Sequence, residues 1–171
     1  DPDSLEHSCY DLFLHKGSVP AGLPGQLLLP TSHESISLLP SSTALATLER
    51  QSPGQSGLGL VIAKSLAQLW QDFDYAVIDS PPLLGVLMVN ALAASQQLVI
   101  PVQTEHLAVK GLERMVNTLA MINRSRKQPL PFSIVPTLFD RRTQASLGTL
   151  RVLRDMYPEE IWQGYIPVDT R

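Results

Sequence analysis

The sequence predicts an α/β fold in which a mainly parallel sheet is covered by helices on both faces. From residue 74 onward, apolar runs of strand length alternate with longer segments of helical periodicity, which is typical of βαβ units. The runs are continuously apolar, as expected for parallel strands that are buried on both faces. The chain has 171 residues, of which 44% are hydrophobic and 17% charged, and this composition excludes an intrinsically disordered chain. We therefore expect a single α/β domain over residues 1–171.

The individual elements are predicted from local patterns. Prolines punctuate the first third, where we expect a helix over residues 4–14, two short apolar runs at 26–29 and 36–39, and a polar loop at 51–57. Apolar residues at helical spacing predict three further helices, over residues 58–73, 105–125 and 147–157. Continuous apolar runs predict four strands, at residues 75–78, 98–102, 132–138 and 161–168.

Composition also argues against membrane and disulfide-rich proteins. The longest nearly apolar stretch, residues 81–95, is interrupted by Asn90 and is shorter than the ~18 residues that a membrane-spanning helix needs. Cys9 is the one cysteine, which excludes disulfide frameworks and sites built from several thiolates. A lone cysteine fits a reducing compartment, so we expect a cytoplasmic protein without a membrane span.

The segment most informative about chemistry is residues 74–85, Asp-Tyr-Ala-Val-Ile-Asp-Ser-Pro-Pro-Leu-Leu-Gly. Asp79 follows the first predicted strand, and ligands of open parallel sheets bind beyond the carboxyl ends of the strands. A carboxylate at that position suits Mg²⁺ held together with a phosphate. The two prolines restrict the backbone, and Gly85 leaves room for close approach to a ligand. Taken alone, the same pattern is equally typical of an aspartate that caps the turn after a strand.

Three later blocks complete a pattern that resembles a known family. They are residues 98–105 (Leu-Val-Ile-Pro-Val-Gln-Thr-Glu), residues 135–143 (Val-Pro-Thr-Leu-Phe-Asp-Arg-Arg-Thr) and residues 164–167 (Gly-Tyr-Ile-Pro). With the Asp79 segment they resemble the ParA/MinD-type ATPases with a deviant P-loop, and more closely the ParA-like partition and positioning proteins. The resemblance implies a P-loop NTPase-like fold with a deviant Walker motif, which binds ATP and Mg²⁺ and forms a homodimer with ATP.

The resemblance also implies roles for individual residues. Asp79 is similar to the acidic residue that ends the Walker B strand and supports Mg²⁺ through water. The residues that correspond to the switch II loop, which senses the γ-phosphate, are Ser80, Pro81, Pro82 and Gly85. The residues that correspond to the adenine pocket are Thr137, Pro167 and Val168.

The sequence departs from the family in one respect. It contains no glycine-rich run that ends in Gly-Lys-Ser or Gly-Lys-Thr, although phosphate binding needs consecutive N–H groups at a helix start together with a lysine. In the family this motif lies upstream of the position that Asp1 occupies. We therefore expect an incomplete domain, truncated at both ends, which lacks the P-loop strand and the C-terminal helix. Alone, it should aggregate through exposed strand edges and bind ATP poorly.

Basic residues are concentrated in residues 110–154. This segment carries nine basic and two acidic residues, whereas the rest of the chain carries four and fourteen. In the family a basic surface in this region binds DNA phosphates without reading sequence. The candidates for DNA contact are Arg124, Arg126, Lys127, Arg141 and Arg142. The alternative is a set of ordinary solvated helix faces.

Three functions remain open at this point. The first is an ATP-hydrolysing switch that positions DNA or a polar protein cargo and is stimulated by an activating adaptor protein. The second is a non-enzymatic module of the same fold that binds DNA or a partner. The third is a superfamily synthetase that activates a small carboxylic acid with ATP. A nitrogenase-type iron protein is disfavoured, because its cluster takes two cysteines from each subunit.

Overall fold

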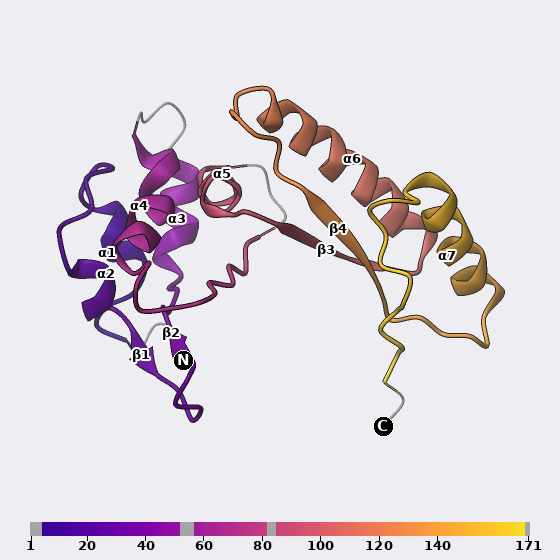
Figure 1. The fold of residues 1–171 in the computed structure, drawn as a ribbon, viewed down its shortest axis with the longest axis horizontal. Helices are drawn as coiled ribbons and strands as arrows, with labels where there is room; N and C mark the ends of the chain where they lie inside the picture. The colour runs from indigo at the N-terminus through magenta and orange to yellow at the C-terminus, as the bar shows by residue number, and fades with distance from the viewer. Residues whose placement is uncertain (1–4, 52–56, 82–84, 170–171) are drawn as a thin grey trace. The chain divides into compact units, whose positions relative to one another are not determined.

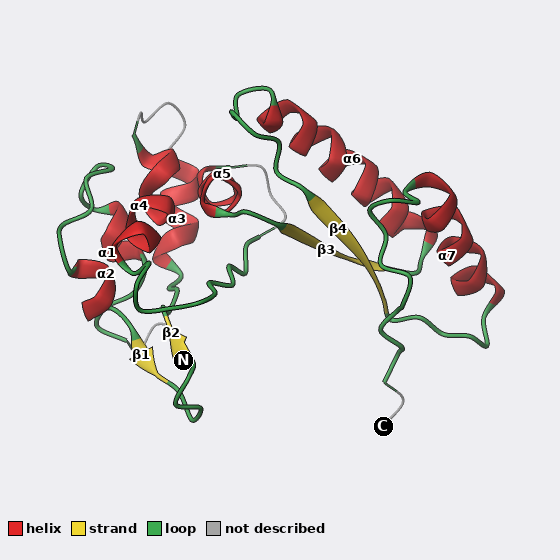
Figure 2. Ribbon diagram, in the orientation of Figure 1, coloured by secondary structure: helices red, strands yellow, loops and turns green. Residues whose placement is uncertain are grey.

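The computed structural model describes residues 5–51, 57–81 and 85–169, and the chain divides into two compact units. Unit 1 comprises Asp1–Ser95 and unit 2 comprises Gln96–Arg171. Figures 1 and 2 show the elements of each unit. The regular elements of unit 1 are mainly short helices, and unit 2 combines helices with parallel strands. Each unit is described by itself below.

Unit 1 packs short helices around a small apolar core. Its helices are α1 (Tyr10–Phe13), α2 (Leu23–Gln26), α3 (Ala44–Gln51), α4 (Val61–Gln68) and α5 (Val86–Ala94), with the 3₁₀ helix η2 (Leu58–Leu60) directly before α4. The strands β1 (Leu29–Pro30) and β2 (Ser37–Leu38) form an antiparallel pair. The buried residues of the core are Leu12, Phe13, Leu27, Leu58 and Val61. The helix predicted at residues 4–14 is shorter in the structure, where α1 covers Tyr10–Phe13.

Helix α5 was not predicted, because its residues are apolar on all sides except at Asn90. Asn90 is only 1% exposed and is satisfied by three hydrogen bonds. Its amide donates to the carbonyl oxygens of Leu58 at 2.7 Å and Val86 at 2.8 Å, and its oxygen accepts from the Ile62 backbone N–H at 3.1 Å. Asn90 therefore joins α5 to η2 and α4, and the residue that interrupts the apolar stretch is a structural one.

The predicted strand at residues 75–78 is wrong for this structure. Residues 75–80 adopt no regular secondary structure, and the side chains of Tyr75 and Val77 are 89% and 96% exposed. A strand requires a neighbouring strand for its N–H and C=O groups, and no described segment pairs with this one. The predicted helix over 58–73 is also shorter than expected. It ends at Gln68 with Leu69 as its C-cap, and the segment that follows contains Trp70, Asp72 and Phe73, whose helix propensity is lower.

Unit 2 contains the βαβ unit that the sequence predicts. Strand β3 (Leu98–Gln103), helix α6 (His106–Asn123) and strand β4 (Phe132–Thr137) follow one another, and helix α7 (Gln144–Met156) comes next. The strands are parallel, with Leu98 opposite Phe132 and Gln103 opposite Thr137. The predicted strands at 98–102 and 132–138 and the predicted helices at 105–125 and 147–157 are therefore confirmed within a few residues.

Helices α6 and α7 contribute to one apolar core with β3 and β4. Its buried residues are Val102, Val109, Leu112, Ile134, Leu153 and Ile161. On β3, Val99 is 58% exposed and Pro101 and Gln103 are also exposed, while Val102 is buried. Because successive side chains of a strand point to opposite faces, the helices of unit 2 cover one face of the two-stranded sheet.

The predicted strand at residues 161–168 forms only two isolated parallel bridges with the β4 region, Ile134 with Ile161 and Phe139 with Pro167. Between these bridges the chain bends. At the bend the Trp162 ring lies against Gly164, where any larger side chain would overlap it. The segment therefore follows β4 at both ends without forming a continuous ladder.

Candidate functional site

The carboxyl ends of β3 and β4 meet at one edge of unit 2, which is where ligands of parallel sheets bind. The backbone N–H of Thr104 donates to the carbonyl oxygen of Thr137 at 3.1 Å, so the strand pairing continues one residue beyond β3. Thr104 is buried, and its exposed neighbours Gln103 and Glu105 flank it on either side. Two polar side chains are thus presented at this edge.

Three residues predicted for the adenine pocket lie close together at the same edge. The Ile166 N–H donates to the Pro136 oxygen at 2.8 Å, and the Val168 N–H donates to the Phe139 oxygen at 3.1 Å. These bonds hold residues 166–168 against the end of β4, which includes Thr137. The structure therefore brings Thr137, Pro167 and Val168 into one local cluster.

Two features of this cluster were missed by sequence reasoning. Leu138 has a φ angle of 51°, a left-handed conformation that non-glycine residues rarely adopt, and its side chain is exposed. The rings of Phe139 and Tyr165 are in contact, with centroids 4.3 Å apart. Tyr165 lies within the Gly-Tyr-Ile-Pro block, but nothing in that pattern indicates its ring partner. Both features shape the loop that follows β4.

A buried hydroxyl network fixes the loop between β4 and α7. The hydroxyl oxygens of Thr104 and Ser146 are 2.5 Å apart, and Ser146 Oγ also accepts from the backbone N–H of Asp140 at 3.1 Å. Thr143 caps α7, because its Oγ1 accepts from the Ser146 N–H at 3.3 Å. The end of β3, residues 140–143 and the start of α7 are therefore tied together by side chains.

Arg142 is engaged by Asp140 in the same loop. Its Nε donates to Asp140 Oδ1 and its Nη2 to Asp140 Oδ2, both at 2.9 Å. The hydrogen bonds from Arg142 lower the pKa of Asp140 to about 2, and the carboxylate raises the pKa of Arg142. Arg141 is exposed. Of the two arginines in this loop that are predicted to contact DNA, Arg142 is thus already paired with a carboxylate.

The five residues predicted to contact DNA do not form one patch. Arg124, Arg126 and Lys127 lie between the end of α6 and the start of β4, and Arg126 Nε donates to the Gln128 oxygen at 3.2 Å. Arg141 and Arg142 follow the opposite end of β4. Because a six-residue strand spans about 20 Å, the two groups lie at opposite edges of the sheet in unit 2.

The residues predicted to hold Mg²⁺ and to sense the γ-phosphate, Asp79 to Gly85, belong to unit 1. Asp79, Ser80 and Pro81 are exposed, and Gly85 directly precedes α5, while Pro82 lies outside the described residues. An exposed carboxylate is compatible with Mg²⁺, which keeps several waters and takes one or two acidic partners. Among the described residues, no group of three His, Cys, Asp or Glu side chains could form an all-protein metal cage. Asp79 therefore fits a role as one ligand, or as a support for the ion's waters, beside phosphate oxygens.

The start of α5 is held by a residue that sequence reasoning missed. Oε2 of Glu49, on α3, accepts from the backbone N–H of Leu87 at 3.0 Å. The Glu49 carboxylate lies where a β-carbon on Gly85 would be, so any larger residue at position 85 would overlap it. No local pattern could have indicated this contact, because its two residues are 38 positions apart.

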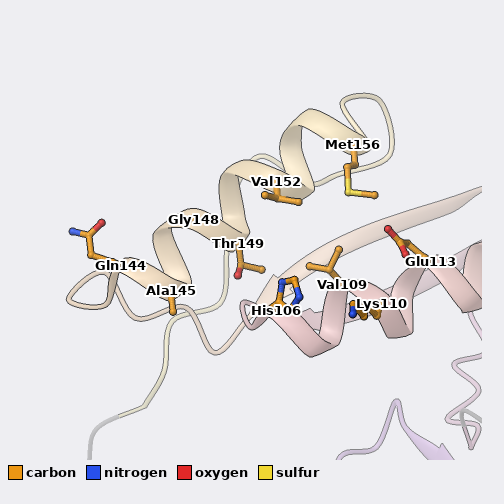
Figure 3. Close-up of a pocket in the computed structure, with 10 residues that line it drawn as sticks. All are labelled: His106, Val109, Lys110, Glu113, Gln144, Ala145, Gly148, Thr149, Val152 and Met156. Carbon is orange, nitrogen blue, oxygen red and sulfur yellow. The ribbon is translucent and has the colours of Figure 1, made fainter.

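A groove of about 510 Å³ runs between α6 and α7. Figure 3 shows Thr149 and Met156 pointing from α7 toward α6. The polar residues of its α6 wall are His106, Lys110 and Glu113. No residue predicted for a site lines this groove.

Two further observations concern the Cys9 thiol and the length of the apolar helices. Burial, and to a smaller extent Asp11, raises the pKa of the Cys9 thiol from 9.0 to about 11, as expected of an inert, partly buried thiol. No helix in the described part of the chain is long and apolar enough to cross a membrane.

Comparison with known proteins decides the family. Residues 2–132, more than half of the chain, match the family model AAA_31, described as an AAA domain. The chain belongs to this family. The AAA_31 chain is 27% identical to the sporulation initiation inhibitor protein Soj of Bacillus subtilis over 168 residues, covering 98% of the chain and 64% of Soj. It is 26% identical to the chromosome partitioning protein ParA of Myxococcus xanthus over 170 residues, covering 99% of the chain and 58% of ParA. It thus spans about three fifths of the length of these curated relatives, and the ParA/MinD-type resemblance is confirmed.

Solved structures confirm the α/β fold of P-loop NTPases for the AAA_31 chain. Cobyrinic acid a,c-diamide synthase from Mycobacterium smegmatis is 31% identical with a TM-score of 0.85, covering 100% of this chain and 68% of that chain. That protein was solved with an ATP analogue and magnesium, and also with ADP and magnesium. Apo McdA from Cyanothece is 20% identical with a TM-score of 0.76, covering 86% of this chain and 60% of its own, and supports the fold alone.

Proposed function

We propose that the chain is part of a ParA-like ATPase that positions DNA or a protein cargo through ATP-dependent dimerisation. One observation carries this proposal: the likeness to the B. subtilis protein Soj and to the M. xanthus chromosome partitioning protein ParA extends over 98% and 99% of the chain. It therefore includes both the Asp79 loop and the Thr137 cluster. Because the chain is shorter than those relatives, the activity is proposed for a longer protein that also supplies the P-loop.

Asp79 is the residue we assign to Mg²⁺. When bound, Mg²⁺ supplies charge neutralisation for the transferring phosphoryl group, and catalysis in this class is mostly positioning and electrostatic stabilisation. The exposed Asp79 carboxylate would orient the waters of the ion. Ser80, Pro81, Pro82 and Gly85 form the segment that senses the γ-phosphate, and they lead into α5.

Thr137, Pro167 and Val168 are assigned to the adenine base. The support for this assignment is their local clustering through the backbone bonds of residues 136–139 and 166–168. The half-buried Thr137 and Val168 offer a partly apolar wall, which suits the face of a base.

The Mg²⁺ assignment is tested by calorimetric titration of the full-length protein with ATP, with and without magnesium. Asp79→Asn removes the charge, and we expect it to weaken magnesium-dependent binding at least tenfold while ATP binding in EDTA stays unchanged. Asp72→Asn, an exposed aspartate outside the loop, is the matched control and should bind as the wild type does. An Asp79→Asn protein with wild-type magnesium dependence would refute the assignment.

The absence of a P-loop motif gives a second test. The 171-residue chain alone should bind Mg-ATP much more weakly than the full-length protein, because the phosphate-binding N–H groups and lysine are not in its sequence. Equal affinity of the two proteins would contradict this reading.

A second candidate function is an ATP-dependent ligase that activates a small carboxylic acid. It is favoured by the 31% identity to the M. smegmatis protein named cobyrinic acid a,c-diamide synthase, of which the chain covers 68%. The two functions are separated by measuring ATP turnover of the full-length protein. Stimulation by a carboxylic acid with an amide donor supports the ligase, and stimulation by an adaptor protein or by duplex DNA supports the positioning ATPase.

DNA binding is proposed for the basic groups of unit 2. Variants at the two opposite edges of its sheet test which group contacts DNA. We expect replacement of Arg124, Arg126 and Lys127 by alanine to weaken retention on non-specific duplex at low salt and to reduce its salt dependence. Arg141→Ala tests the opposite edge. Unchanged retention in both variants would exclude these residues and favour ordinary solvated surfaces.

A further inference from the structure

The contact between Glu49 and the start of α5 is unusual because it comes from another helix. The first N–H groups of any α-helix lack partners inside the helix, and a nearby side chain normally caps them. Gly85, the N-cap of α5, has no side chain, and the first turn of α5 contains no acidic residue. Glu49 on α3 supplies the missing acceptor through its 3.0 Å bond with the Leu87 N–H.

The chemistry of the contact suits a carboxylate. The N-terminus of a helix carries a partial positive charge, so an anion there is stabilising. The space for it exists because residue 85 is glycine, and the carboxylate lies over its α-carbon. The φ angle of Gly85 is −159°, which any residue adopts, so a larger residue at this position would act by displacing the Glu49 carboxylate and not by straining the backbone.

The helix that carries Glu49 is anchored in the apolar core of unit 1. Leu45 and Leu48, on the same helix, pack against the apolar core of unit 1 together with Val86 and Leu87. The outward residues Ala46, Thr47 and Arg50 are exposed. A displacement of the first turn of α5 must therefore either break the bond with Glu49 or carry α3 with it.

We propose that Glu49 is a latch that holds the first turn of α5 in the position described above, and that binding of the γ-phosphate of ATP releases it. This inference rests on the proposed function, in which Gly85 belongs to the segment that senses the γ-phosphate. The latch opposes the ATP-bound arrangement only, because ADP lacks the group that is sensed. Glu49 is thus a positioning residue that sets how strongly the protein distinguishes ATP from ADP. Helix α3, which carries Glu49 and has an exposed face, transmits the bound-nucleotide state to the surface.

The test is the ratio of ATP to ADP affinity in the full-length protein, measured by calorimetry with magnesium. Loss of a helix cap is worth about 0.5–2 kcal/mol. If the latch opposes ATP binding alone, Glu49→Ala should raise ATP affinity between about twofold and thirtyfold and leave ADP affinity unchanged. Glu49→Gln keeps an acceptor oxygen without the charge and should give an intermediate ratio. Arg50→Ala, on the exposed side of the same helix, should behave as the wild type does.

The outcomes separate the latch from the proposed function. A wild-type protein that binds neither nucleotide refutes both. A wild-type protein that binds ATP, with a ratio that is unchanged or reduced in Glu49→Ala and Glu49→Gln, refutes the latch alone. A purely structural role for Glu49 would weaken both nucleotides equally.

Hydrogen exchange supplies a second readout on the unmodified protein. Addition of Mg-ATP should increase exchange of the peptide that contains the Leu87 amide, whereas Mg-ADP should not. Protection that increases with ATP at this peptide would overturn the proposal, even if the variant with alanine at position 49 fails to fold.

Discussion

Replacing Ser146 by alanine tests whether the buried hydroxyl network fixes the loop after β4. The substitution removes the 2.5 Å contact with Thr104 and the acceptor for the Asp140 N–H. An unsatisfied buried donor costs about 1–3 kcal/mol. The Thr104 hydroxyl keeps an alternative acceptor, the Leu138 oxygen at 3.4 Å, and therefore adds little to that cost. We expect a loss of about 2 kcal/mol in the free energy of unfolding.

The assay is urea unfolding of the full-length protein followed by circular dichroism. Ser125→Ala is the matched control, because Ser125 is exposed and its hydroxyl bonds only a local carbonyl, that of Ile122 at 2.8 Å. It should change stability by less than about 0.5 kcal/mol. A double-mutant cycle with Thr104→Val should give a coupling energy above about 0.5 kcal/mol. A Ser146→Ala loss as small as that of the control, or strictly additive losses in the cycle, would refute the network.

Three further predictions concern the Asp140 carboxylate, the Cys9 thiol and the exposed side chains of Tyr75 and Val77. Arg142→Ala should raise the pKa of Asp140 from about 2 toward its ordinary 3.8, measured by carboxyl NMR; a pKa that stays at 2 would contradict the role of Arg142. Because the folded-state pKa is depressed, the pair stabilises the fold above the ordinary pKa, and this contribution is lost as pH falls toward 2. Cys9 should react with iodoacetamide only slowly at pH 8 and faster as pH rises toward 11, whereas rapid labelling at pH 8 would disagree with its raised pKa. For the same reason the fold loses stability as pH rises from 9 to 11. Tyr75→Lys and Val77→Lys in the 171-residue chain should reduce light scattering from aggregates without loss of stability, and a loss above about 2 kcal/mol would show that these side chains are packed.

Unit 2 could be predicted from the sequence because its elements are long and its core is local. Helix α6 follows a regular spacing of apolar residues, and β3 and β4 are mainly apolar runs joined by one helix. The parallel direction of the two strands follows from that connection, since a helical crossover returns the chain in the same direction. Only residues 161–168 deviate, where Trp162 and Gly164 interrupt the ladder.

Unit 1 could be predicted only in part, because its structure depends on contacts between distant residues. Helix α5 has no polar face that would reveal its period, and it is defined by the bonds of Asn90 to residues about 30 positions away. The cap by Glu49 spans 38 positions. For the site, the family resemblance named Asp79 and Thr137, whereas Ser146 and Glu49 act through partners that no short motif contains.

The disagreement at residues 75–78 is itself informative about function. Every local preference in this run favours a strand, yet Tyr75 and Val77 are almost fully exposed and no described strand pairs with them. Sequences normally agree with their structures at each level, and exceptions concentrate at functional or strained positions. Here the exception directly precedes Asp79, the carboxylate that we assign to Mg²⁺. The same unpaired run gives the physical reason for our expectation that the chain by itself aggregates, because its exposed N–H and C=O groups can pair with those of another chain.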